Sequence, residues 1–164
     1  MTKTMIAKAN NYIKIMEACS AYVAKEKPAC NDASSVYKII NPVIQSASNN
    51  QQESFFLIPL DYKKHMIGAP VEIFRGVVNA CYISPRDIFQ KALLANAAAI
   101  IVAHNHPSGN PEPSEADWDM TKKLIIAGNI IGIEVVDHLI IGNKTHNYEG
   151  FINLRRRKPY LFEK

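Results

Sequence analysis

The sequence has few of the residues that mark disulfide-stabilised, cysteine-metal or membrane-spanning proteins. It holds three cysteines, an odd number, and no Cys-x-x-Cys pair, which argues against a disulfide framework and against a cysteine zinc site. The longest apolar stretch, around residues 92–103, is interrupted by Asn96 and is shorter than the roughly 20 residues of a membrane-spanning helix. The first residues lack the sustained apolar segment of a signal peptide. We therefore expect a cytoplasmic protein without membrane attachment.

The composition is that of an ordinary folded domain. Hydrophobic residues make up 48% and charged residues 21% of the 164 residues, enough apolar surface to bury a core without disulfides. The net charge of +4 is mildly basic, and much of the excess lies in Arg155, Arg156, Arg157 and Lys158. A solvated tail is the favoured interpretation of this run, and a phosphate-binding patch is the alternative.

Apolar periodicity alternates between helical and extended patterns along the chain. It predicts helices over 3–27, 32–50, 84–96 and 114–127, and strands over 54–61, 71–83, 98–103 and 133–141. Pro42 is expected to kink the second helix, Gly76 to mark a bulge, and Gly128 to cap the last helix. We predict a mixed α+β fold whose sheet is flanked by helices, with residues 1–31 as a helical extension and linker and 32–164 as the main domain.

The first predicted helix has a regular apolar stripe that needs a partner. The stripe consists of Met5, Ala9, Ile13, Met16, Ser20 and Val23. An isolated helix of this length is only marginally stable in water. Packing against the chain's own domain is the favoured interpretation, and packing against a second copy in a homodimer is the alternative.

One short segment contains residues that suit metal chemistry. His104 and His106 are two apart, so both side chains point to the same side of an extended strand, and Asp117 in the next helix brings a carboxylate toward them. Two imidazoles and one carboxylate leave a tetrahedral zinc ion with one open position, as in catalytic sites. The same residues also fit two solvated histidines followed by a plain capping box of Ser114 and Asp117.

The segment resembles a known signature. His-x-His, seven residues, Ser, two residues, Asp is the JAMM motif of the MPN/JAB metal hydrolases, complete here as His104, His106, Ser114 and Asp117. The surrounding HNHPSG and PSEAD, the SPRDIF at 84–89, the NAAA at 96–99 and the GIEVVDH at 132–138 resemble the RadC branch, over roughly 32–150. The resemblance implies an MPN/JAB-like, cytidine-deaminase-like sheet flanked by helices, and one zinc ion held by His104, His106 and Asp117.

The resemblance also implies catalytic roles. The family uses an upstream glutamate as general acid and base, and Glu53 occupies that position, with Glu72 as a rival. Ser114 would donate a hydrogen bond to the developing oxyanion. Two departures are present. Ser84 and Asp87 stand where the family often has histidine and glutamate, and the segment before Asp32 lacks the helix-hairpin-helix of typical RadC proteins.

Four other residues receive structural interpretations. Asn105 is expected to point away from its two histidine neighbours. His138 follows Asp137 on a predicted core strand, and a structural Asp–His pair is favoured over a role behind a metal ligand. His65 and His146 are expected in loops.

Three functions follow from these patterns. The favoured one is a zinc-dependent hydrolase that cleaves an amide, peptide or isopeptide bond of a protein or peptide substrate. The alternatives are a DNA-associated repair or nuclease-type protein and a metal-binding interaction module without turnover. Zinc deaminases are excluded, because the chain lacks both His-x-Glu and Pro-Cys-x-x-Cys.

Overall fold

A five-stranded sheet forms the centre of the molecule, with the strand order β2-β1-β3-β4-β5. The computed structural model describes residues 2–47, 52–76, 83–145 and 149–163. The strands are β1 Glu53–Leu60, β2 Val71–Gly76, β3 Ala99–Asn105, β4 Glu134–Lys144 and β5 Glu149–Asn153. The helices are α1 Lys3–Glu26, α2 Ala33–Ala47, α3 Pro85–Leu94, α4 Glu115–Ile131 and α5 Leu154–Arg157, followed by the 3-10 turn η2 Pro159–Leu161. The mixed α+β class is therefore confirmed.

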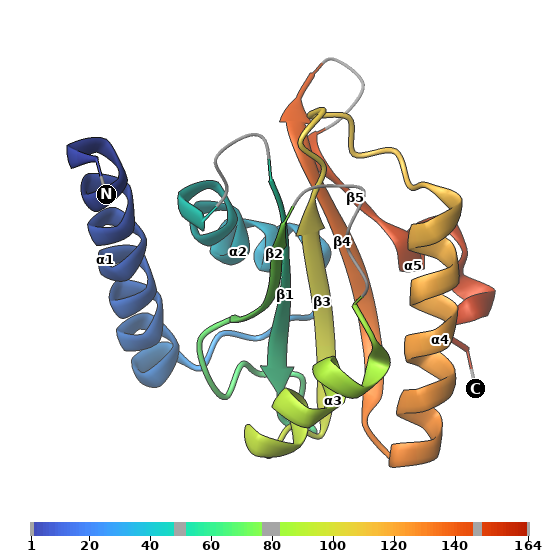
Figure 1. Ribbon diagram of the computed structural model, residues 1–164. Coiled ribbons are helices and arrows are strands. Elements are labelled where there is room, and N and C mark those ends of the chain that lie inside the picture. The colour runs from blue at the N-terminus through green and yellow to red at the C-terminus, as the bar shows by residue number, and fades with distance from the viewer. Residues whose placement is uncertain (1, 48–51, 77–82, 146–148, 164) are drawn as a thin grey trace.

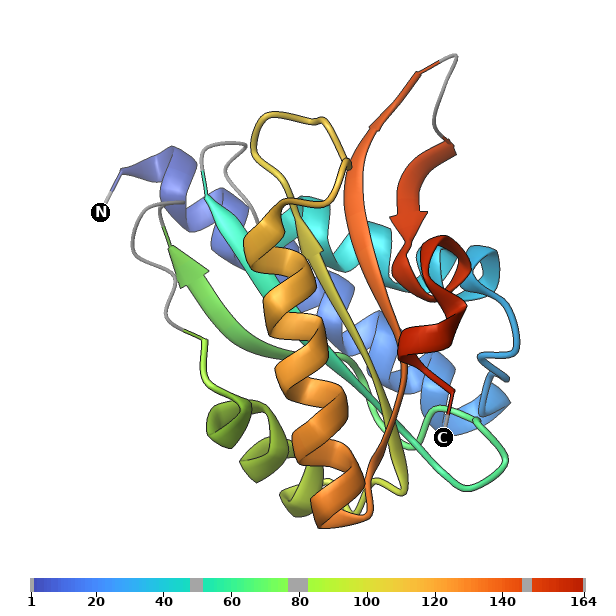
Figure 2. The ribbon, with the colours of Figure 1, turned by 90° about the vertical axis from the view of Figure 1, so that its right-hand side faces the viewer.

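Helices cover both faces of this sheet, as Figures 1 and 2 show from two directions. On one face, alternate residues of β1, β3 and β4 pack against α2 and the second half of α1. On the other face, the intervening residues pack against α3 and α4. The central strand β3 is buried along its whole length, which explains its uninterrupted apolar sequence.

Strand direction gathers the candidate residues at one end of the sheet. β1 runs antiparallel to β3, so that the start of β1 lies beside the end of β3. β3 and β4 are parallel and are joined through α4, which returns the chain to the same sheet. The first turn of α4 therefore lies near the carboxyl end of β3, the usual location of binding sites in such sheets.

Several predicted boundaries need correction. Gly128 does not end α4, which continues to Ile131 and is capped by Gly132 in the left-handed conformation at φ 84°. A Cβ on Gly128 would lie 2.4 Å from the backbone oxygen of Ile133, so glycine is required there for close packing of helix and strand. The irregularity in the β1–β2 pair falls opposite Phe55 and Phe56, not at Gly76. The predicted strand over 71–83 is confirmed to Gly76, and residues 77–82 lie outside the described residues.

Helix α1 packs on its own domain through only part of its predicted stripe. Val23 is buried, and Tyr12, Ile15, Met16 and Cys19 pack against the same core. Met5 and Ile13 are exposed, so the stripe is rotated relative to the prediction and its first half is uncovered. Packing on the chain's own domain is confirmed, and association with a second copy stays a prediction.

Among the described residues, none of the helices combines the length and the apolar composition that a membrane crossing requires.

Candidate metal centre

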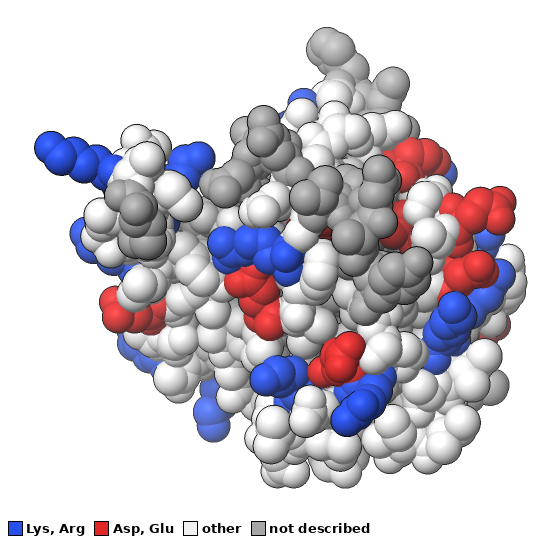
Figure 3. All heavy atoms as spheres, viewed as in Figure 1, with Lys and Arg blue, Asp and Glu red and all other residues white. Residues whose placement is uncertain are grey.

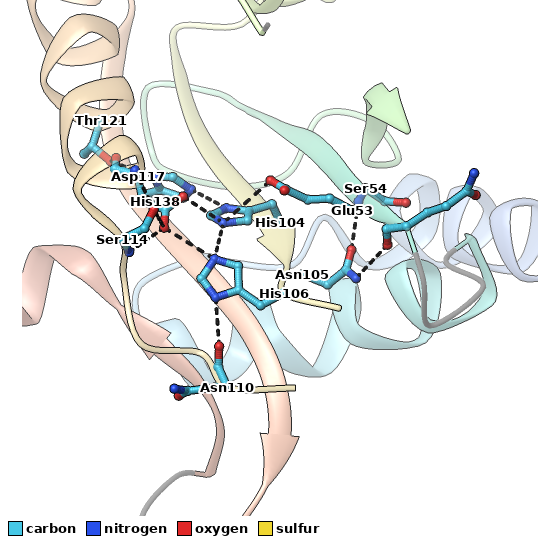
Figure 4. Close-up of polar contacts among 11 residues, drawn as sticks. Glu53, Ser54, His104, Asn105, His106, Asn110, Ser114, Asp117, Thr121 and His138 are labelled. Carbon is cyan, nitrogen blue, oxygen red and sulfur yellow. Dashed lines mark hydrogen bonds and ion pairs between the residues drawn. The ribbon is translucent and has the colours of Figure 1, made fainter. Parts of the chain in front are cut away.

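Three side chains from β3, the loop after it and α4 converge at the end of the sheet (Figure 4). The Nε2 atoms of His104 and His106 lie 3.1 Å apart. Asp117 places Oδ1 3.1 Å from His104 Nε2 and Oδ2 3.3 Å from His106 Nε2. These are the donor types that a zinc ion takes from histidine and aspartate.

The spacing of these three donors fits a small tetrahedral cation. Donor atoms about 2.0–2.2 Å from a tetrahedral zinc ion lie roughly 3.3–3.6 Å from one another. In this centre the two Nε2 atoms are 3.1 Å apart, and they lie 3.1 and 3.3 Å from the two different oxygens of Asp117. Two imidazole nitrogens and a carboxylate at this distance repel one another unless a cation or a proton lies between them. The residues present therefore fit a single divalent metal ion.

His106 is held by the loop that follows β3. Its Nδ1 lies 2.8 Å from the backbone oxygen of Asn110. A carbonyl only accepts hydrogen bonds, so Nδ1 carries a proton, and in the neutral ring Nε2 presents a lone pair to the centre. The loop is itself fixed to β4, since the backbone N–H of His106 donates to Ile141 and that of Asn143 donates to Gly109.

Asp117 is positioned by a complete capping box at the start of α4. The backbone N–H of Ser114 donates to Asp117 Oδ2 at 2.7 Å, and the Ser114 hydroxyl donates to the same oxygen at 2.6 Å. The backbone N–H of Asp117 donates in return to Ser114 Oγ. The capping box and the metal interpretation thus coexist, because Asp117 uses both carboxylate oxygens. The Ser114 hydroxyl is engaged with Asp117, and its predicted contact with an oxyanion requires it to turn.

Glu53 faces the same cleft from the start of β1. Its Oε1 lies 4.0 Å from His104 Nε2, and its side chain is 15% exposed, so it stands beside the three donors without joining them. The rival Glu72 points elsewhere, because it accepts hydrogen bonds from Arg75 and from the Tyr12 hydroxyl. Geometry therefore favours Glu53 over Glu72 as the acid beside the centre.

Asn105, which lies between the two histidines, bonds the backbone on both sides of Glu53. The β1–β3 ladder has its last pair at Phe55 and His104. Beyond it, the Asn105 side chain accepts the Ser54 backbone N–H at 2.8 Å and donates to the Gln52 backbone oxygen at 3.1 Å. The side chain thus fixes the residues on both sides of Glu53, in agreement with the structural role expected for it.

The predicted pairing of Asp137 and His138 is wrong at the level of their side chains. His138 is fully buried, and its Nε2 lies 2.8 Å from Nδ1 of His104. Asp137 instead accepts the backbone N–H groups of His138 and Arg155. His138 therefore stands behind a candidate metal ligand. Its strand position was predictable from the sequence, but its contact depends on the register between β3 and β4, which aligns His138 with Val102.

The acid–base properties of the centre suit a cation. Burial alone would raise the pKa of Asp117, but hydrogen bonds from His104, His106 and Ser114 outweigh it and hold that pKa well below its usual value. Burial alone would lower the pKa of His106, yet its bonds to Asp117 and Asn110 raise it overall. Burial holds the pKa of His138 well below the ordinary histidine value, so His138 is neutral.

A cleft of about 370 Å³ opens beside the donors, and its lining includes Glu53, Phe55, Ile83, Ser114 and Met120. Glu115 and Asp119, in the first two turns of α4, are exposed, and Figure 3 shows acidic side chains on the surface at this end of the helix.

Three residues of the basic C-terminal run have partners within the chain. The Arg155 guanidinium donates to the backbone oxygen of Val136, Arg157 pairs with Glu112, and Lys158 lies 4.1 Å from the ring centre of Trp118. These contacts hold the run against the domain, while Arg155, Arg156 and Arg157 stay exposed.

The fold and the three convergent donors define a mixed α+β domain with a candidate metal-binding centre. Residues 30–155 match the RadC-like JAB domain, and the chain belongs to this family. Similar proteins include UPF0758 proteins of Shouchella clausii, 39% identical over 131 residues, and of Actinobacillus pleuropneumoniae, 37% identical over 126 residues. The alignments cover 73% and 77% of this chain and 54% and 57% of those relatives. The chain thus spans about half the length of the curated relatives it matches.

Proposed function

We propose that this protein is a zinc-dependent hydrolase that cleaves an amide, peptide or isopeptide bond in the cytoplasm. The observation that carries the proposal is the convergence of His104, His106 and Asp117 within 4.8 Å of one another. The acidic Glu53 in the adjoining cleft supports an enzyme over a metal-binding module without turnover.

The residues would divide the chemistry as follows. His104, His106 and Asp117 would hold the metal, which when bound supplies Lewis acidity that lowers the pKa of water and polarises a carbonyl. Glu53 would accept the proton of the attacking water at its carboxylate and then deliver it to the leaving amine. Ser114 would keep Asp117 oriented through its two hydrogen bonds and donate to the oxyanion when its hydroxyl turns. Phe55 and Met120 would limit access of bulk water to the cleft.

A DNA-directed role has weaker support. Much of the excess basic charge lies in the C-terminal run, and three of its four residues are engaged within the chain. The cleft itself is lined by the acidic Glu53 and Asp117 together with apolar side chains, which suits a peptide better than a nucleic-acid phosphate backbone.

The test is a cleavage screen of zinc-loaded protein against peptide, isopeptide-linked and DNA substrates. Glu53→Gln keeps the shape of the side chain but removes its basic oxygen, and we expect it to lower kcat by about 10²–10⁴-fold, the usual contribution of a general base. Glu72→Gln is the matched control, a glutamate of the neighbouring strand that faces Tyr12 and Arg75. Full activity of Glu53→Gln, or cleavage of DNA alone, would contradict the proposal.

A further inference from the structure

Behind His104 lies a buried chain of polar groups that returns to another candidate metal ligand. His104 Nδ1 contacts His138 Nε2 at 2.8 Å, and His138 Nδ1 contacts Thr121 Oγ1 at 2.7 Å. Thr121 Oγ1 in turn lies 2.6 Å from the backbone oxygen of Asp117. The chain thus joins β3, β4 and α4, and it connects the side chain of His104 with the backbone of Asp117 (Figure 4).

The direction of every hydrogen bond in this series follows from its last acceptor, the backbone oxygen of Asp117. A carbonyl oxygen only accepts, so the single hydroxyl proton of Thr121 is donated to Asp117. Thr121 Oγ1 must then accept at its other contact, which requires a proton on His138 Nδ1. A neutral His138 with this proton has a lone pair on Nε2 and accepts from His104 Nδ1.

The tautomer of His104 is the consequence. With its proton on Nδ1, the imidazole of His104 presents a lone pair at Nε2, the atom that faces His106 and Asp117. The opposite tautomer would place a proton at Nε2 and could not bind a metal there.

Burial prevents water from replacing any member. Thr121 and His138 have 0% exposure and His104 has 1%. The ring of Phe55 stacks on His104, with centroids 5.6 Å apart and an interplanar angle of 9°, and it meets His138 edge-on. A polar group in such surroundings has no substitute partner if one member is lost.

We propose that Thr121 and His138 are positioning residues that select the metal-binding tautomer of His104 and thereby set the metal affinity of the centre. This inference rests on the metal site of the proposed function but not on the substrate or the cleavage reaction. Thr121 itself makes no side-chain contact with a metal-ligating atom among the described residues.

The experiment compares Thr121→Val with Thr121→Ser in zinc binding, measured by competition with a chelator of known affinity. Valine keeps the shape of threonine but removes the hydroxyl, whereas serine keeps the hydroxyl and removes a buried methyl group. We expect Thr121→Val to bind zinc about 10- to 100-fold more weakly, the usual effect of losing an outer-shell partner, and Thr121→Ser to bind it as the unaltered protein does. A purely structural role predicts the reverse, since the lost methyl of Thr121→Ser affects packing.

A second measurement keeps the inference separate from metal loading and from catalysis. Nitrogen-15 NMR of the metal-free protein reports which imidazole nitrogen of His104 is protonated. We expect a proton on Nδ1 in the unaltered protein and in Thr121→Ser, and its loss from Nδ1 in Thr121→Val. An unprotonated Nδ1 in the unaltered protein, or equal zinc affinity of the two variants, would overturn the inference. Absence of any zinc binding would count against the proposed function. The NMR result would still decide whether Thr121 and His138 control the tautomer of His104.

Discussion

His104 and His106 are two residues apart and present the same atom to the same centre, yet they are held in opposite ways. His104 is 1% exposed and contacts His138, which in turn contacts Thr121, inside the sheet–helix interface. His106 is 18% exposed and rests on a loop carbonyl of Asn110. One wall of the centre is therefore part of the domain core, and the other is a loop fastened to β4.

Because of this difference, the two histidines contribute equally to the donor set but unequally to the stability of the fold. Loss of either ligand removes one of three donors, but only loss of His104 also opens a cavity and leaves a buried partner unpaired. The buried wall links the site to folding, whereas the loop wall affects the site alone.

The largest effect is expected from His104→Ala compared with His106→Ala in metal-free protein. His104→Ala removes a buried ring and strands His138 Nε2, so we expect the free energy of unfolding to fall by about 3 kcal/mol. His106→Ala should cost less than about 1 kcal/mol, because its ring is partly solvated. Chemical denaturation checks the pair, and equal losses would remove the distinction between the two walls.

Zinc should stabilise only the protein that keeps both histidines. A ligand that binds only the folded state at 100 times its Kd adds about 2.7 kcal/mol to the free energy of unfolding. We expect this gain in the unaltered protein and its absence in both alanine variants, since each lacks a ligand. Thermal unfolding with zinc and with excess chelator measures it. A zinc-dependent gain that persists in His106→Ala would show that the loop histidine is not a ligand.

Asn105, which lies between the two histidines, should affect neither ligand. Asn105→Ala leaves the buried Ser54 backbone N–H without its acceptor, at a cost of about 1–3 kcal/mol. Asn105→Asp keeps an acceptor and should cost less at that contact. We expect zinc affinity to be unchanged in Asn105→Asp while kcat falls, because the side chain of Asn105 fixes the residues on both sides of Glu53. Weaker zinc binding in Asn105→Asp would show that the hydrogen bonds of Asn105 position the two histidines instead.

The smallest effect is the contribution of His106 to the pH dependence of metal-free stability. The pKa of His106 is raised in the folded metal-free protein, because its bonds to Asp117 and Asn110 outweigh burial. A raised pKa stabilises the fold below the unfolded value of about 6.5 and loses that contribution as pH rises through the folded value.

We therefore expect metal-free stability to fall as pH rises above about 6.5, and zinc affinity to rise over the same range because the proton leaves His106. Denaturation and zinc titration between pH 6 and 8.5 test both trends, with His106→Gln as the control. A dependence that survives in this variant would have to arise from another group.

The elements of the fold could be predicted where local chemistry alone decides them. The Ser84 capping box starts α3 as expected, and Ser114 starts α4 in the same way. The apolar run of β3 places it at the centre of the sheet. Gly128 was predicted wrongly, because a glycine required by close packing and one required by a left-handed turn look the same in a sequence.

The sequence by itself determined the placement of the candidate metal donors, since the two-residue period of a strand aligns His104 with His106 and the capping box fixes Asp117 at the first turn of α4. Only the tertiary structure decided which residues contact the far side of His104, namely His138 and, through it, Thr121. His138 is 34 positions from His104, and no local period relates the two. Their contact exists because β3 and β4 pair in parallel with one particular register. The same long-range pairing separates Glu53 from Glu72, since β1 alone among the two strands borders β3.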